Sequence, residues 1–170
     1  KGHGRSEGIR GYASSFSALN EDLLEVVRIV KEKYPAHSVY LLGHSFGGLV
    51  VLSTLLRNER LSVQGAIISA PLLGIAVKLP PLKKFFGELI APVLGKFQLE
   101  NEINPEVLSH DPEVVERYRT DRLVHNKITP RLFTEMTKEM DWVRSCTGPT
   151  GAQKFLFLLP LEDKLVDSSV

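Results

Sequence analysis

Apolar positions change their spacing several times along the first 71 residues. Over 16–34 they recur at helical intervals, and the stripe consists of Leu19, Leu23, Val26, Val27 and Val30. Short apolar runs at 38–42 and 63–69 are typical of buried parallel strands, and the apolar segment 46–57 between them is expected to be a helix. The order helix, strand, helix, strand predicts an α/β fold built on a doubly wound, mostly parallel sheet.

The pattern differs from residue 72 onward. Prolines interrupt a strongly apolar stretch at 72–97, and strand character returns only at 154–159. A long insertion of helix and loop between two strands of one sheet predicts a cap. We therefore expect a core formed by 1–71 and 151–170, with a helical cap inserted at 72–150. Within that cap, polar helices are expected at 112–119 and 130–145.

One apolar stripe in the predicted cap has two interpretations. Its members lie at helical spacing with lysines on either side, and they include Phe85, Phe86, Leu89 and Ile90. The stripe is either the inner face of a helix packed on the core or a lid that faces lipid at a membrane surface. The sequence leaves both open.

Candidate chemistry is concentrated in the five residues Gly43-His44-Ser45-Phe46-Gly47, between a predicted strand and a predicted helix. A serine flanked in this way is the sequence form of a nucleophile elbow, in which a strained turn holds the hydroxyl clear of the sheet. We expect glycine at 43 and 47 because larger side chains would collide with neighbouring backbone. Ser45 is then the predicted nucleophile, and the Phe46 backbone N–H is a predicted oxyanion donor.

A serine nucleophile needs a histidine base and a carboxylate that orients it. Asp163 follows the strand at 154–159 in a turn and fits the acid. In this kind of sheet the histidine comes after the acid, but no histidine of this sequence follows Asp163. The five histidines are His3, His37, His44, His110 and His125. Of these, His44 is expected to be a packing residue. We expect the catalytic histidine to lie outside this chain and the 170-residue piece to be inactive alone.

Several segments besides the elbow carry a recognisable pattern. They are Gly2-His3-Gly4-Arg5-Ser6-Glu7-Gly8 with Arg10-Gly11-Tyr12, Ser69-Ala70-Pro71, the stretch from Leu108 to His125, and Glu162-Asp163-Lys164-Leu165-Val166-Asp167. In this order they resemble the monoacylglycerol lipase/lysophospholipase family of α/β-hydrolases, over nearly the whole chain. The resemblance implies an α/β-hydrolase fold with a mobile cap, and cleavage of acyl esters of glycerol or lysophospholipids. It also implies the roles of nucleophile for Ser45, acid for Asp163 and oxyanion donor for the Phe46 N–H.

The sequence departs from that family in three places. The upstream segment that supplies a second oxyanion donor and the histidine beyond the acid are absent, and Pro160 stands where glycine is common. The chain also begins at Lys1, without methionine, inside a motif. We therefore expect a fragment that lacks both ends of the hydrolase.

Net charge, the length of apolar runs and the cysteine count limit which partners and which cellular compartment we expect. A formal net charge of +1, without a basic cluster, gives no basis for nucleic-acid binding. No apolar run reaches the length of about 18 residues that a membrane span needs. The single cysteine, Cys146, favours a reducing compartment, although a secreted protein without disulfides is the alternative. We expect a cytoplasmic protein, and peripheral contact with membranes through its cap is one of the two open interpretations of the apolar stripe. The sequence leaves the oligomeric state open.

The acidic cluster of Asp111, Glu113 and Glu116 lacks the histidine or cysteine that a transition metal prefers, and we expect a solvated helix N-terminus there. Neither a metal nor a cofactor is expected.

The sequence predicts two-step acyl transfer, in which Ser45 takes the acyl group from a lipophilic ester and water then releases it. The alternatives are a carboxylesterase, thioesterase or peptidase on the same scaffold, and a catalytically dead protein that binds through its cap.

Overall fold

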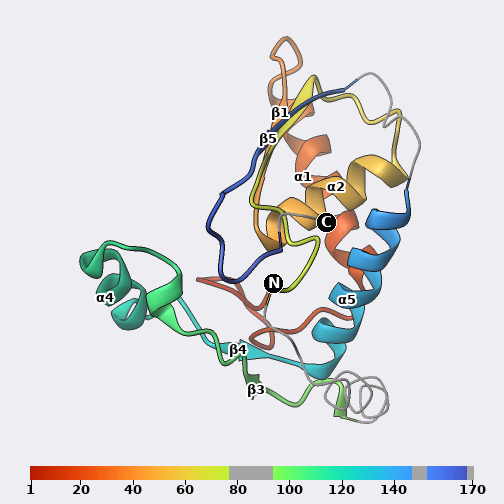
Figure 1. Ribbon diagram of the computed structural model, residues 1–170. Coiled ribbons are helices and arrows are strands. Elements are labelled where there is room, and N and C mark those ends of the chain that lie inside the picture. The colour runs from red at the N-terminus through yellow and green to blue at the C-terminus, as the bar shows by residue number, and fades with distance from the viewer. Residues whose placement is uncertain (77–93, 147–152, 168–170) are drawn as a thin grey trace. The chain divides into compact units, whose positions relative to one another are not determined.

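The computed structural model describes residues 1–76, 94–146 and 153–167 (Figure 1). These residues form two compact units: one contains 1–15 and the described part of 79–136, and the other contains the described parts of 16–78 and 137–170. Each unit combines residues of the predicted core with residues of the predicted cap. The division into core and cap stays a prediction. The predicted lid stripe, Phe85, Phe86, Leu89 and Ile90, lies outside the described residues.

The larger unit is built on a parallel sheet with the strand order β1-β2-β5. Its strands are β1 (Tyr40–His44), β2 (Gly65–Ser69) and β5 (Lys154–Leu158). In the register, Gly43 lies opposite Ile68, and Ile67 lies opposite Leu156. The predicted parallel sheet is therefore confirmed, although β5 is separated from β2 by more than eighty residues of sequence.

Helices α1 (Phe16–Lys33) and α2 (Phe46–Arg57) lie on one side of this sheet (Figure 1). Contacts run from α2 to both β1 and β2, and from α1 to α2. The apolar core between them contains fully buried Leu49, Leu55 and Ile68. Both helices match their predicted segments because their apolar spacing has the helical period. α1 begins at Phe16, so Ser17 lies inside its first turn.

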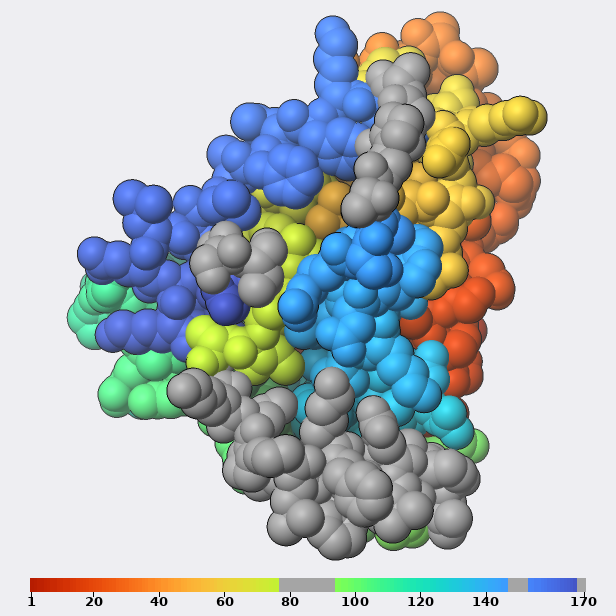
Figure 2. All heavy atoms as spheres, turned by 45° about the vertical axis from the view of Figure 1, so that its right-hand side comes forward, coloured from red at the N-terminus to blue at the C-terminus, as the bar shows by residue number. Residues whose placement is uncertain are grey.

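Burial differs among the three strands. β2 is the central strand and is mostly buried, whereas in β1 only Leu41 and Gly43 are buried and Leu42 is 70% exposed. Most side chains of β5 are exposed, and Figure 2 shows this blue segment at the surface. The reason is that β5 lies at an edge of the three-stranded sheet.

The second half of a third helix, α5 (Pro130–Ser145), belongs to this unit from Thr137 onward and is held in it by a buried polar network. The Ser53 hydroxyl donates to Glu139, and Asn20 Nδ2 donates to Ser53 Oγ at 2.8 Å. Arg57 pairs with Glu139 at 2.9 Å and lies 3.6 Å from the Trp142 ring centroid. In Figure 2 the C-terminal half of α5 (light blue) lies beside the end of α2 (yellow). The network joins α1, α2 and α5.

The smaller unit contains the N-terminal loop and four short elements. These are β3 (Leu99–Glu100), the 3₁₀ turn η1 (Pro105–Val107), α4 (Pro112–Thr120) and β4 (Lys127–Ile128). β3 and β4 form an antiparallel ribbon. The Asp111 side chain caps α4 by accepting from the Glu113 N–H at 2.9 Å, which confirms the expected helix N-terminus there.

Gly11 ties the N-terminal loop to β4. Its φ is +66°, and an added Cβ would lie 2.2 Å from the Lys127 carbonyl oxygen. The Gly11 carbonyl accepts hydrogen bonds from both the N–H and the hydroxyl of Thr129, a fully buried residue just before α5. Glycine is required here because only it combines positive φ with so close an approach of two backbones. Among the described residues, none of the helices is long and apolar enough to cross a bilayer.

Candidate active site

Ser45 occupies the single position between β1, which ends at His44, and α2, which begins at Phe46. Its φ of 53° and ψ of −119° are far from the regions that non-glycine residues favour. Such a conformation costs about 1–3 kcal/mol and persists only where the surroundings impose it. The serine side chain makes no capping hydrogen bond to α2. The predicted strand, strained turn and helix are confirmed, and the role of Ser45 as nucleophile stays a prediction.

The predicted collisions explain only one of the two motif glycines, Gly43 and Gly47, on either side of Ser45. A Cβ on Gly43 would lie 2.5 Å from the Gly47 carbonyl oxygen, so glycine is required there. A Cβ on Gly47 would have no described atom within 4 Å, so the predicted collision at that position is wrong. The second crowded glycine is Gly48, where a Cβ would lie 3.0 Å from Pro71 Cα. The reason is that Gly48 faces the segment after β2.

Both backbone polar groups of Ser45 are held by residues outside its own turn. The Ser45 N–H donates to the Ser69 carbonyl at 2.9 Å, and the Leu72 N–H donates to the Ser45 carbonyl at 3.0 Å. The Leu49 N–H adds the first helical bond to the same carbonyl at 3.2 Å. These bonds fix the peptide groups on either side of the strained residue.

Phe46 is the first residue of α2, where backbone N–H groups have no intrahelical acceptor and the helix dipole is positive. Its ring packs edge-on against Phe16 of α1, with centroids 5.9 Å apart. The side chain is thus engaged with α1, while the N–H belongs to the open first turn of the helix. That geometry suits an oxyanion donor, and the assignment stays a prediction.

Asp163 lies in the loop after β5 and is partly exposed. Its Oδ1 accepts the N–H of Leu165 at 2.8 Å and the N–H of Val166 at 2.9 Å. These bonds orient the carboxylate while using one of its two oxygens. Oδ2 is the oxygen that would accept from a histidine, as the predicted acid role requires.

One segment, residues 69–76, contacts the loops of both predicted catalytic residues. Its first part bonds to Ser45, as described above. Its second part pairs with the loop after Asp163, since the Ala76 N–H donates to the Leu165 carbonyl at 3.0 Å and the Asp167 N–H donates to the Gly74 carbonyl at 3.1 Å. Sequence reasoning missed this role, and its only signal was Ser69-Ala70-Pro71, one of the segments that carry the family resemblance.

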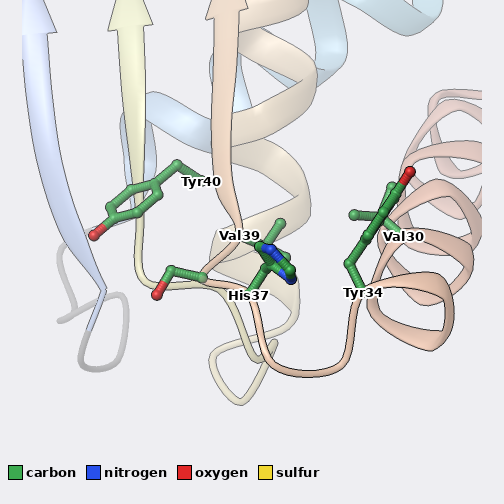
Figure 3. Close-up of a pocket in the computed structure, with 6 residues that line it drawn as sticks. Val30, Tyr34, His37, Val39 and Tyr40 are labelled. Atoms are coloured by element: carbon green, nitrogen blue, oxygen red, sulfur yellow. The ribbon is translucent and has the colours of Figure 1, made fainter.

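The structure brings none of the described histidines into a catalytic pairing with Asp163, whose carboxylate accepts from the N–H groups of Leu165 and Val166 in its own loop. His44 is exposed, with Nδ1 3.2 Å from Ser69 Oγ, so its expected packing role is wrong. His37 lies before β1 and lines a pocket of about 400 Å³ with Tyr34 and Tyr40 (Figure 3). This pocket is at the start of β1, at the opposite end from Ser45.

His3 and His125 pair in the smaller unit. His3 Nδ1 lies 3.1 Å from His125 Nε2, which is 2.9 Å from the Gly2 carbonyl. The Lys127 N–H donates to His125 Nδ1, so the neutral His125 ring carries its proton on Nε2. Partial burial, and then His125 and Arg10 nearby, hold the pKa of His3 below its usual value. Among the described residues, no three His, Cys, Asp or Glu side chains gather as a metal site.

A parallel sheet whose strand enters a helix through a strained serine, with the acid candidate in the loop after another strand, defines the α/β-hydrolase fold. The chain belongs to the Hydrolase_4 family, described as serine aminopeptidase, S33, which it matches over residues 1–170. It is a monoacylglycerol lipase-like member of that fold, as the expected resemblance implied.

The similar proteins include a rat monoglyceride lipase (Rattus norvegicus), 33% identical over 170 residues that cover 98% of this chain and 55% of the relative. A monoacylglycerol lipase from Paleococcus ferrophilus has a TM-score of 0.70 at 28% identity, covering 84% of this chain and 52% of its own. A monoglyceride lipase from Saccharomyces cerevisiae, solved with a substrate analogue, shares the fold with a TM-score of 0.79 at 16% identity, covering 99% and 59%. The chain therefore spans about half the length of these relatives.

Proposed function

We propose that the protein containing this chain hydrolyses carboxylic esters of lipids, with monoacylglycerols or lysophospholipids as its substrates. The observation that carries the proposal is the strained Ser45 at the junction of β1 and α2. An energetically unfavourable backbone at a polar residue next to a helix N-terminus is typical of a nucleophile held for reaction. The names of the relatives, monoglyceride and monoacylglycerol lipases, support a lipid ester as the substrate.

In the proposed reaction, Ser45 Oγ attacks the ester carbonyl carbon while a histidine takes the hydroxyl proton. The N–H of Phe46 stabilises the charge on the carbonyl oxygen. The bond to the alcohol then breaks, and the histidine returns the proton to the leaving glycerol oxygen. Water, deprotonated by the same histidine, then attacks the acyl-serine carbonyl carbon. The bond to Ser45 Oγ breaks, the histidine returns the proton to that oxygen, and the fatty acid is released. Asp163 orients the histidine, which we assign to a residue outside the five of this sequence, and no cofactor or metal takes part.

Turnover by the full-length protein tests this assignment. We expect Ser45→Ala to remove hydrolysis of monoacylglycerols and to abolish labelling by a fluorophosphonate probe, with a loss of several powers of ten. Ser17→Ala is the matched control because Ser17 is an exposed serine on α1 whose hydroxyl donates to Glu21 within its own helix. Undiminished turnover in Ser45→Ala would contradict the proposal. Absence of any turnover in the unmodified protein would favour the binding-only alternative.

A peptidase is the second candidate, because the matched family is described as serine aminopeptidase. Elbow geometry does not separate esters from amides, since substrate choice depends on the cap and pocket. A panel of monoacylglycerols of increasing chain length, lysophospholipids, acyl thioesters, short esters and aminoacyl anilides distinguishes the classes. We expect kcat/KM to be highest for long-chain glycerol or lysophospholipid esters. A preference for the aminoacyl anilides would replace the lipase with the peptidase.

The isolated 170-residue piece is proposed to be inactive. It holds the predicted nucleophile and acid but no histidine after Asp163. Removal of a triad member leaves only the small acceleration that binding and the oxyanion hole supply. The measurement is ester turnover by the purified piece and by its Ser45→Ala variant. Turnover above background that depends on Ser45 would show that the piece contains its own base.

A further inference from the structure

We infer that residues 69–76, here called the strap, position Ser45 for reaction, and that the Leu72 N–H is the central contact. This inference rests on the proposed function. Leu72 is a positioning residue, because it contacts the main chain of Ser45 and no reacting atom. Its effect would be to fix the direction of the serine hydroxyl.

The strap holds Ser45 from both sides. Ser69 accepts the Ser45 N–H, and Leu72 donates to the Ser45 carbonyl, at 2.9 and 3.0 Å. With φ at 53° and ψ at −119°, Ser45 is outside the regions that a free serine adopts. Bonds to both of its peptide groups are what keeps such a residue from relaxing, and helical bonding alone supplies only the Leu49 contact.

The strap is itself fixed to the sheet and to α2. Ala70 also has a positive φ, 41°, is buried, and donates its N–H to the Leu158 carbonyl at the end of β5 at 2.8 Å. Pro71 has a ring-restricted φ, and its Cα and Cβ would lie 3.0 and 3.1 Å from a Cβ on Gly48. The absence of a side chain at Gly48 is what lets the strap approach α2 so closely.

The far end of the strap fixes the loop of the predicted acid. Ile75 and Val166 form an antiparallel bridge, and Val166 is buried. The same Val166 donates its N–H to Asp163 Oδ1. A single segment therefore runs from the peptide of Ser45 to the residues that orient Asp163. Displacing it would change the position of the nucleophile relative to the acid, and such misplacement lowers the rate of the chemical step.

The test removes the Leu72 N–H and keeps every side chain, and it also weakens the Pro71 carbonyl as an acceptor of the Leu73 N–H. In the full-length protein, Leu72 is replaced by its α-hydroxy acid, which converts the peptide N–H to an ester oxygen and keeps the side chain. The matched control is the same replacement at Leu61, a leucine outside the strap whose N–H donates to the Asn58 carbonyl after α2 at 2.8 Å. We expect the change at Leu72 to lower kcat and the fluorophosphonate labelling rate by about five- to tenfold, with KM within about twofold. At Leu61 we expect kcat within about twofold of the unmodified protein.

Two results would overturn the inference: an unchanged kcat in the Leu72 variant, or equal losses in both variants. If the Leu72 bond were only structural, the melting temperature would fall in both variants, and kcat would not differ between them. Gly48→Ala is a second test of the strap, because the added Cβ would crowd Pro71 and displace it. We expect kcat to fall and KM to stay unchanged. Unchanged kcat in that variant also counts against the strap. Failure of the proposed function is separate, because it appears as undiminished turnover in Ser45→Ala.

Discussion

The Ser53 hydroxyl donates a 2.5 Å hydrogen bond to the Glu139 carboxylate, and both residues are buried. Glu139 also accepts from Arg57, whose guanidinium stacks on Trp142. A buried carboxylate is stable only where its charge is paired and its oxygens accept hydrogen bonds. This pair therefore attaches α5 to α2 and makes the polar network a determinant of stability.

We expect Glu139→Ala to lower the free energy of unfolding by about 1–3 kcal/mol, because it leaves the buried Ser53 hydroxyl without its acceptor. Arg57 is 42% exposed and stays solvated, so its lost ion pair adds little. Urea denaturation of the full-length protein measures this change. Glu25→Gln is the control, since Glu25 pairs with Arg28 at an exposed site of α1, and we expect a much smaller change there. Equal effects in the two variants would show that burial of Glu139 does not matter for stability.

The His3–His125 pair predicts a dependence of stability on pH. Because folding lowers the pKa of His3, mainly by burial, the unfolded chain binds the proton more readily than the folded one. The contribution of His3 to the free energy of unfolding is then fully present above the ordinary histidine pKa of about 6.5. This contribution is lost as the pH falls below that value. We expect urea midpoints measured between pH 8 and pH 5 to fall toward acid, and His3→Gln to reduce that slope.

His110→Gln is the matched control for the pH experiment. His110 is exposed in the described structure, just before α4. We expect its replacement to leave the pH slope of the urea midpoint unchanged. A slope that persists in His3→Gln, or one that disappears in His110→Gln, would remove the pair as its origin.

The two motif glycines differ in their tolerance of a side chain. We expect Gly43→Ala to destabilise the fold by about 2 kcal/mol, because its Cβ would overlap the Gly47 carbonyl. Gly47→Ala is expected to preserve stability or raise it by up to about 1 kcal/mol, since the site is open and alanine favours the helix. Thermal unfolding of both variants checks the difference. A larger loss in Gly47→Ala would contradict the geometry around the elbow.

Membrane contact through the predicted lid is a separate hypothesis. We expect Phe85→Ala and Phe86→Ala to reduce binding of the full-length protein to liposomes severalfold, because an interfacial helix binds in proportion to its buried apolar area. Sedimentation with liposomes measures it, and kcat on a water-soluble ester controls for folding. Unchanged binding in both variants would favour the interpretation of the stripe as the inner face of a cap helix.

The sequence alone determined the elements that depend on local spacing. Helices at 16–33, 46–57, 112–120 and 130–145 follow from apolar periodicity and from prolines at helix starts. The strand, serine turn and helix around Ser45 were predictable for the same reason, since the motif constrains the backbone over a few consecutive residues. Asp163 was found by its place after a strand.

Tertiary structure alone decided the contacts between residues far apart in sequence. It paired β2 with β5, exposed β5 at the edge of the sheet, and brought the strap against both Ser45 and the loop of Asp163. It also made Gly48, and not Gly47, the crowded position, because Pro71 approaches α2 only after the chain has crossed from β1 to β2. Periodicity reports which face of an element is apolar. Which distant segment covers that face depends on long-range packing, which no local pattern contains.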